Sequence, residues 1–238
     1  SATHADNVPN RIARFWLEKL PAEGVLKLRL SPEPAEQSAA STAKPVVTHD
    51  ADGWPASAQW PGMKKSLFLP GLGDFLAVKV NAFAPRWAML DIAYAGDETQ
   101  REKLRRERLE EVWAKPEGPA TMEETAHTTL YSQWLQHSRL KWAVRKLELW
   151  KGEPRARLTL RFYRISDDNP EVLFAAFPLP CEGTLPTLSS GGLPFTPYKD
   201  QLPGSCRDYF GIDGWAHYAK AEGHWLWVSR DAPLMTLG

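Results

Sequence analysis

The chain has 238 residues, of which 43% are hydrophobic and 24% charged, and its 29 Lys plus Arg balance 29 Asp plus Glu. This is the mixture of a soluble globular chain, long enough for one large domain, and it excludes disordered and fibrous classes. A balanced charge gives no field that would attract a nucleic-acid backbone or an anionic membrane, and no run of about 18 apolar residues occurs, so we expect neither partner.

The first 45 residues predict a connecting segment from an upstream domain. Asn10–Leu20 places apolar side chains at mixed helical spacing, and Val25–Leu30 alternates as a strand does. Ser31–Pro45 is rich in Ser, Ala, Pro and Glu without any period, which is typical of a flexible connection. The opening residues lack the charged and apolar regions of a signal peptide, so we expect the chain to begin inside a longer polypeptide.

The next part of the chain predicts a hairpin and then a helix. Val46–Pro61 reads as two short strands around a turn at Asp50–Gly53, because Asp-x-Asp-Gly favours a positive φ at the glycine. Gly96–Lys115 is charged almost throughout and predicts one exposed helix. The apolar contacts expected of this helix are Leu104, Leu109, Val112 and Trp113.

From Thr128 onward a period of two dominates the sequence. Strands are predicted over Thr128–Gln136, Leu140–Trp150 and Arg155–Arg164, and the short turn Lys151–Pro154 makes the last two a hairpin. Val144 and Leu147 are out of phase, which predicts a β-bulge near Arg145-Lys146. The remaining expectations are a buried strand at Val172–Pro178, a loop at Gly183–Gly192 and two strands within Tyr209–Ser229.

These elements predict an all-β fold. We expect an antiparallel two-sheet super-sandwich with one charged surface helix, and a sandwich domain that covers residues 46–238.

The segment Pro194–Phe210 reads PFTPYKDQLPGSCRDYF and predicts a structured loop that leads to a closing strand region ending in DAPL. This sequence resembles the C-terminal β-sandwich region of the α-mannosidase-type glycoside hydrolases. The resemblance covers most of the chain after about residue 46, through HDADGWPASAQWPGM, SLFLPGLGDFLAV, APRW and the run from His127 to Arg164. It points to a bacterial and fungal branch similar to that family.

The resemblance implies a parent protein that is a retaining, zinc-dependent hydrolase. In that family a catalytic barrel binds zinc through two His and two Asp side chains and uses an Asp nucleophile. This chain departs from the family in lacking an assignable zinc-ligand set and the alternating strand and helix pattern of the barrel. We therefore expect no catalytic residue, metal or cofactor in this chain, with zinc in a separate catalytic barrel domain that is its partner. The expected function is a C-terminal accessory domain that packs on this barrel and helps to line its sugar site.

The closing loop is the predicted carbohydrate-binding site. Its planar hydrogen-bonding groups and aromatic faces suit hydroxyl-rich sugars. The candidates are Tyr198, Asp200, Gln201, Arg207, Asp208 and Tyr209. The alternative is a structural clasp, in which Arg207 bonds loop carbonyls and Asp200 orders the turn.

Two further functions stay open. A stand-alone carbohydrate-binding module would use Trp54, Trp60, Trp87 and Trp134 as a stacking platform, which requires these rings to be exposed in line on a sheet. A purely structural packing domain would instead expose a sizeable apolar patch.

Other reactive groups carry weak signals. His49-Asp50-x-Asp52 could meet at one ion, but adjacent residues of an extended chain point to opposite faces, so a turn stabilised by Asp side chains is favoured. The other histidines lack the spacing of a metal motif. Cys181 and Cys206 could pair, although a single bridge does not make a disulfide scaffold, and neither Ser205 nor Cys206 has the context of a nucleophile.

Overall fold

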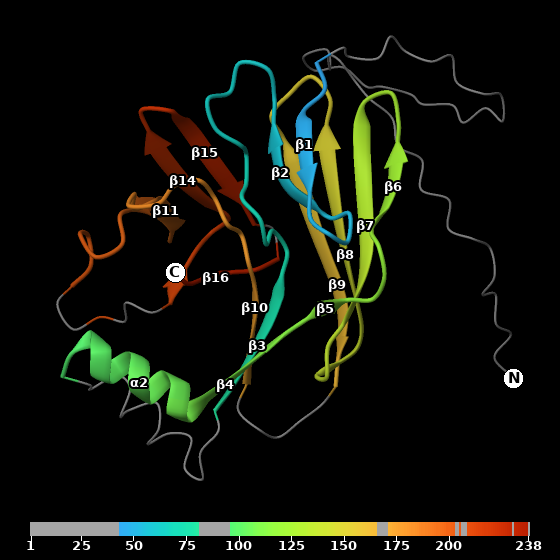
Figure 1. Cartoon of the computed structure of the whole chain (residues 1–238). Helices are drawn as coiled ribbons and strands as arrows, with labels where there is room; N and C mark the ends of the chain where they lie inside the picture. The colour runs from blue at the N-terminus through green and yellow to red at the C-terminus, as the bar shows by residue number, and fades with distance from the viewer. Residues whose placement is uncertain are drawn as a thin grey trace, which may run out of the picture. The chain divides into compact units, whose positions relative to one another are not determined.

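The computed structural model (Figure 1) describes residues 43–80, 96–165, 171–202, 205, 209–229 and 231–237. The chain divides into two units, 1–37 and 38–238, and only the second contains described residues. The short helix or irregular segment expected within 10–20, the strand expected at 25–30 and most of the connecting segment therefore lie outside the described residues.

The first hairpin forms as predicted. Strands β1 (Val46–His49) and β2 (Pro55–Gln59) pair antiparallel. Asp50 builds the turn between them, because its Oδ1 accepts hydrogen bonds from the backbone N–H groups of Asp52 (3.0 Å) and Trp54 (2.8 Å). Gly53 has a φ of +79°, the left-handed conformation that favours glycine.

A central antiparallel sheet contains the longest strands. The order is β5-β7-β8-β9, and β6 also pairs with β7. The strands are β5 (Lys115–Pro116), β6 (Thr121–Glu124), β7 (Thr128–Gln136), β8 (Leu140–Trp150) and β9 (Ala156–Arg164). The predictions for β7, β8 and the β8–β9 hairpin are confirmed.

The predicted bulge near Arg145 is wrong. The pairing of β7 with β8 runs without a break through Arg145 and Lys146, and the irregularity lies between Leu140 and Trp142. Val144 and Leu147 are out of phase simply because they belong to opposite faces of β8. The sequence misleads because Arg145, a charged residue, is buried on the same face as Leu147.

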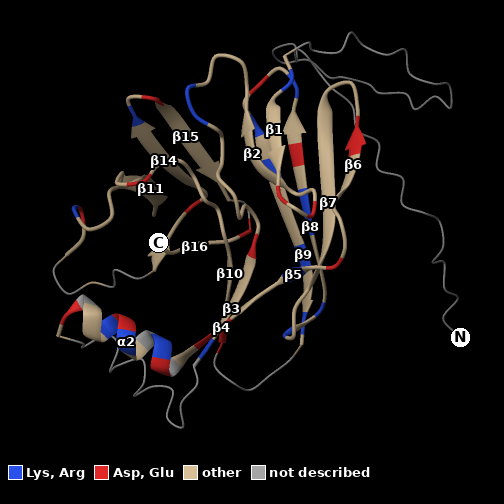
Figure 2. Cartoon of the chain, viewed as in Figure 1, with Lys and Arg blue, Asp and Glu red and all other residues tan. Residues whose placement is uncertain are grey.

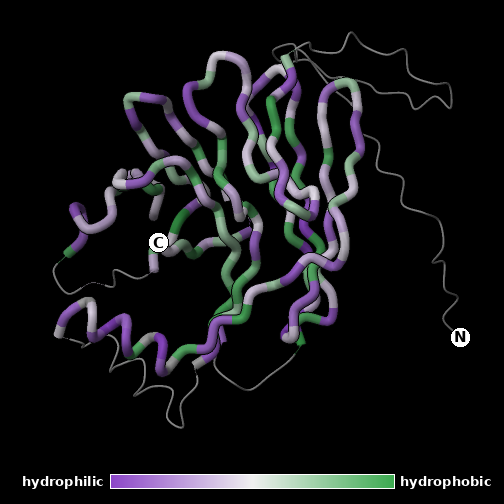
Figure 3. Tube along the Cα trace, in the orientation of Figure 1, coloured by the Kyte–Doolittle hydropathy of each residue, from purple (hydrophilic) through white to green (hydrophobic). Residues whose placement is uncertain are grey.

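The predicted helix is shorter than expected. Helix α2 (Glu98–Arg108) begins where the Asp97 carboxylate accepts the Gln100 backbone N–H at 2.8 Å, and it is hydrophilic along most of its length (Figure 3). The residues after Arg108 form strand β4 (Leu109–Trp113), which pairs with β3 (Phe75–Val80). Three of the four apolar contacts expected of the helix, Leu109, Val112 and Trp113, therefore belong to a strand, because β3 offers them a pairing partner.

The β3–β4 pair extends into a second sheet of order β10-β3-β4. Strand β10 (Glu171–Ala175) replaces the buried strand predicted at Val172–Pro178. It is the edge strand of this sheet, its residues are only partly buried, and Val172 is 45% exposed.

The last part of the chain forms further small sheets. One has the order β12-β11-β14-β15, and β13 pairs with β16. The strands are β11 (Thr187–Ser190), β12 (Leu193–Phe195), β13 (Phe210–Gly211), β14 (Trp215–Lys220), β15 (Gly223–Val228) and β16 (Leu234–Met235). The two strands predicted within Tyr209–Ser229 are confirmed by the β14–β15 hairpin, whereas the loop predicted at Gly183–Gly192 contains β11.

Hydrophobic cores join these layers. One face of the central sheet, here called the inner face, carries Tyr131, Leu135, Ala143, Leu147 and Leu149. Towards one end it packs on Trp54, Trp60 and Phe68 of the first hairpin and the loop after it, and towards the other end on Phe75 of β3. A third core, with Leu188 and Phe210, lies in the C-terminal sheets.

The C-terminal sheets contact the rest of the unit through aromatic side chains. The Trp225 indole N–H donates to the Ser66 carbonyl at 3.2 Å, and the Phe177 and Trp227 rings meet edge to face at 5.3 Å. The fold is therefore all-β and sandwich-like, with antiparallel pairing throughout the described sheets. Among the described residues, no helix has the length and apolar character needed to cross a membrane.

Candidate functional site

The predicted sugar-binding loop uses two of its polar side chains to hold its own backbone. An Asp200 carboxylate oxygen accepts the Thr196 N–H at 2.7 Å, and the Gln201 side-chain oxygen accepts the Tyr198 N–H at 2.9 Å. Tyr198 has a φ of +67°, which L residues seldom adopt without such support. The Asp200 contact agrees with the clasp interpretation, and Gln201, which that interpretation did not include, adds a second contact of the same kind.

The loop also leaves aromatic surface in solvent. Tyr198 and Tyr209 are exposed, and the Tyr198 ring meets Phe210 edge to face at 5.7 Å. Arg207 and Asp208 lie outside the described residues. The structure thus brings Tyr198, Asp200 and Gln201 together in one turn, and a sugar-binding role for this loop stays a prediction.

The histidines and carboxylates considered as metal ligands do not gather into a site in the described part of the chain. Asp50 is engaged by the hairpin turn, and the His49 Nε2 lies 3.3 Å from the Tyr131 hydroxyl. His217 and His224 stack on the β14–β15 hairpin with ring nitrogens 3.1 Å apart. No group of three or more potential ligands is found among these residues.

A buried charged group lies on the inner face. The Arg145 guanidinium donates to the Gln133 side-chain oxygen at 2.7 Å and to Asp74 at 2.6 Å, and it stacks 4.2 Å from the centre of the Trp54 ring. Burial lowers the pKa of Arg145, and the hydrogen bond to Asp74 opposes this effect. Because every contact stays within the fold, we interpret this group as structural.

Two other perturbed groups are also explained by packing. Hydrogen bonds from Lys151 and Lys44 lower the pKa of Glu124 to about 2, and the Lys151 ammonium is itself buried. Burial raises the pKa of the Cys181 thiol, which is free. A buried thiol with a raised pKa is a poor nucleophile.

The tryptophans proposed as a stacking platform separate into two groups. Trp54 and Trp60 are core residues whose indole N–H groups donate to the carbonyls of Leu72 (3.0 Å) and Trp150 (2.8 Å). Trp87 lies outside the described residues. Trp134 is 54% exposed, on the opposite face of the central sheet, here called the outer face. The platform as predicted is therefore wrong for Trp54 and Trp60.

Trp134 belongs instead to a different set of exposed rings, which we call the aromatic strip. Trp142 and Tyr163 are 43% and 51% exposed and lie directly across from each other on β8 and β9. Trp134 on β7 is across from Val144, which lies two residues from Trp142 on the same face of β8. Diagonal neighbours of this kind are about 7–8 Å apart. The strip thus crosses three adjacent strands.

The alternation of β7 and β8 already contained the signal for this strip. Trp134 and Trp142 have the same parity as the polar residues Ser132 and Lys146, and Tyr163 has the parity of Arg161. What sequence could not supply was the register that brings the three rings to one end of the sheet.

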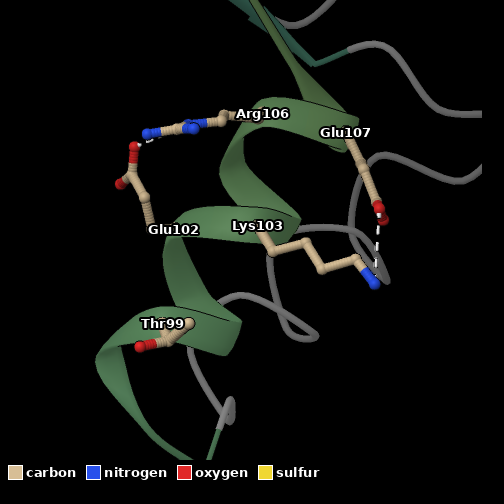
Figure 4. Close-up of a pocket in the computed structure, with 5 residues that line it drawn as sticks. All are labelled: Thr99, Glu102, Lys103, Arg106 and Glu107. Atoms are coloured by element: carbon tan, nitrogen blue, oxygen red, sulfur yellow. Dashed lines mark hydrogen bonds and ion pairs between the residues drawn. The ribbon is translucent and has the colours of Figure 1, made fainter.

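A hollow beside α2 is the remaining candidate (Figure 4). It is lined by Thr99, Glu102, Lys103, Arg106 and Glu107, all from the same helix. Arg106 pairs with Glu102 at 3.2 Å and Lys103 with Glu107 at 3.9 Å. Its charges are thus satisfied along the helix, and we assign it no ligand.

No protein-family model matches the chain, and no curated protein or solved structure matches it significantly.

Proposed function

We propose that this chain is a carbohydrate-binding β-sandwich domain that serves as the C-terminal accessory domain of an α-mannosidase-like glycoside hydrolase. The carbohydrate part is carried by one observation, the exposure of Trp134, Trp142 and Tyr163 together on the outer face. The accessory part rests on the sequence resemblance of the segments that include the closing loop and the run from His127 to Arg164.

Exposed rings on a sheet suit a sugar ligand. The face of an aromatic ring is electron-rich, and the C–H groups on one side of a pyranose ring carry partial positive charge, so the two flat surfaces attract each other when water is excluded. Large aromatic side chains cluster on an outer surface at some cost, and such clusters usually mark binding sites. Because the strand pairing fixes the spacing of the strip, little order has to be gained when a ligand binds.

The packing role in a larger enzyme is supported by apolar residues on the C-terminal sheets. Leu226 and Val228 are largely exposed and share one face of β15, opposite to the face that buries Trp225. A face of this kind is suited to cover a neighbouring domain. In this proposal the catalytic barrel supplies the zinc and the chemistry, while the sandwich holds the substrate near it.

The proposal is tested by binding of soluble polysaccharides to the chain of 238 residues. A panel that includes mannan and a β-glucan is measured by affinity gel electrophoresis with the wild type, Trp134→Ala and Trp142→Ala. Each substitution is expected to weaken binding about fivefold to tenfold, because each removes one stacking contact worth roughly 1 kcal/mol.

Trp113→Ala is the matched control. Trp113 is 49% exposed but lies on β4, which belongs to the β10-β3-β4 sheet and not to the central sheet. Its loss should leave both affinity and melting temperature unchanged, and the two strip variants should also melt like the wild type. The proposed function would be contradicted if the wild type bound none of the polysaccharides. It would also be contradicted if all three variants lost affinity equally.

A further inference from the structure

The aromatic strip has cations beside it. Arg161 lies on β9 in the same cross-strand row as Val144 and Trp134. Lys146 belongs to the next row of the same face, across from Ser132 and Thr159. The Lys141 ammonium lies 4.8 Å from the centre of the Tyr163 ring. Figure 2 shows the Lys and Arg residues of β8 and β9 as blue segments along these strands.

These cations are not neutralised by the fold. Neither Arg161 nor Lys146 forms an ion pair with any described residue, and both are exposed. The neighbouring Arg164, in contrast, pairs with the buried Glu171 carboxylate at 3.2 Å. The positive charge next to the strip is therefore available to a ligand.

The outer face also carries carboxylates, and one of them, Glu117, follows β5 beside the strip. Towards the other end of the sheet, a Glu148 carboxylate oxygen lies 3.7 Å from a guanidinium nitrogen of Arg157. Glu123 lies on β6, across from Leu130 of β7. The Glu117 backbone N–H donates to the Trp134 carbonyl at 2.9 Å, and Lys115 lies two residues earlier, on β5. The β8–β9 side of the strip is thus the side with excess positive charge.

The two ends of the outer face differ in whether cationic side chains cover their tryptophan rings. At the end opposite to the strip, Trp150 is buried beneath Arg155 and Arg157, whose guanidinium groups lie 4.5 Å and 5.3 Å from the centre of its ring. Among the described residues no such cation covers Trp134 or Trp142. The protein thus covers Trp150 with its own arginines, whereas at the strip the cation found over a ring in the described residues is Lys141, over Tyr163, and the two tryptophans have none.

We infer that the ligand of this face is an acidic glycan, one whose sugar rings stack on Trp134, Trp142 and Tyr163 while a carboxylate pairs with Arg161. This inference rests on the proposed function and adds the ligand class. A guanidinium presents two parallel N–H donors that match the two oxygens of a carboxylate, which favours Arg161 as the specific contact. Lys146 adds a second, less directional charge.

A nucleic acid is the competing ligand, because bases also stack on aromatic rings. Nucleic-acid affinity comes mainly from many phosphate contacts, typically about 6–10 for a tight complex. Among the described residues, the cations beside the strip are Arg161, Lys146, Lys141 and Lys115, and the whole chain has no net charge. This charge density fits a glycan held mainly by stacking.

The test compares two glycans that differ only in charge. Polygalacturonate and its methyl ester have the same backbone, and the ester lacks the free carboxylates. At low salt we expect the chain to bind polygalacturonate about tenfold more tightly than the ester. Salt of about 0.15 M should reduce this preference, because exposed charges are then screened. Arg161→Gln should remove the preference while leaving binding of the ester intact.

Lys199→Gln is the matched control, since Lys199 is an exposed cation on the closing loop rather than on the outer face. It should retain the preference. Equal binding of both glycans, lost in Trp134→Ala, would overturn the acidic class and leave the proposed function standing. Binding of neither these glycans nor the neutral panel would overturn the proposed function itself. Tighter Trp134-dependent binding of single-stranded oligo(dT) would replace the glycan with a nucleic acid.

Discussion

The inner and outer faces of the central sheet are made by alternate residues of the same strands, and they differ in what covers them. On β8, Ala143, Arg145 and Leu147 are buried against the first hairpin and the β10-β3-β4 sheet, while Trp142 and Lys146 remain in solvent. On the inner face even a charged residue is enclosed and paired. On the outer face even a tryptophan is left open at one end. The type of residue therefore does not decide its role here, whereas the layer on its side of the sheet does.

The largest effect is expected where the inner face is packed most tightly. Leu147 is fully buried between Trp54 and the neighbouring strands, so Leu147→Ala should lower the free energy of unfolding by about 3 kcal/mol. Lys146→Ala, one residue along the same strand on the outer face, should change it by less than about 0.5 kcal/mol. Urea denaturation measures both values. Similar costs for the two variants would remove the distinction between the faces.

A smaller effect is expected from the buried charge of the inner face. Asp74→Ala leaves the Arg145 guanidinium with the Gln133 oxygen but without its carboxylate, which should cost about 2 kcal/mol of unfolding free energy. In an Arg145→Met background the same Asp74 substitution should lower the free energy of unfolding much less, because no buried cation then loses its carboxylate partner. A double-mutant cycle measured by denaturation gives this coupling. Equal costs in both backgrounds would show that Asp74 acts independently of Arg145.

The smallest expected effect is the acid dependence that Glu124 gives the edge strand β6. Its pKa is lowered from 4.5 to about 2 in the folded chain, so its contribution to stability is complete above pH 4.5 and is lost as the pH falls from there towards 2. Glu124→Gln should therefore be less stable than the wild type at neutral pH, and the difference should shrink below pH 4.5.

Glu123→Gln is the control for this pH profile, because Glu123 is the neighbouring exposed carboxylate of the same strand and forms no ion pair among the described residues. Melting temperatures between pH 2 and 7 compare the three proteins. A gap between the wild type and Glu124→Gln that is constant over this range would mean that the two lysines do not hold the Glu124 carboxylate.

The sequence predicted the strands well and the faces only in part. Alternation placed β7, β8 and the β8–β9 hairpin correctly, because a period of two is a direct consequence of the extended backbone. It failed at Arg145, a charged residue that is buried because Asp74, distant in sequence, and Gln133, across from it on β7, accept its hydrogen bonds. It also failed after Arg108, where pairing with β3 overrides the helical tendency of the charged run.

The candidate site was the least predictable part. Composition drew attention to the tryptophans, and alternation puts Trp134 on the polar face of β7, but it does not show that Trp54 and Trp60 cover the inner face while Trp134 stays 54% exposed. The contribution of Trp142 and Tyr163 depends on the register of β8 with β9. Strand register and the packing of layers are non-local, so they became visible only in the folded chain.

The most direct test follows the indole N–H signals of the chain by nuclear magnetic resonance while an oligogalacturonate is added. We predict that the indole N–H signals of Trp134 and Trp142 shift until the oligogalacturonate saturates its binding site. Those of Trp54 and Trp60, whose N–H groups are donated to backbone carbonyls in the core, should stay in place. Signals of Trp134 and Trp142 that do not move while those of other tryptophans do would contradict a binding surface on the outer face.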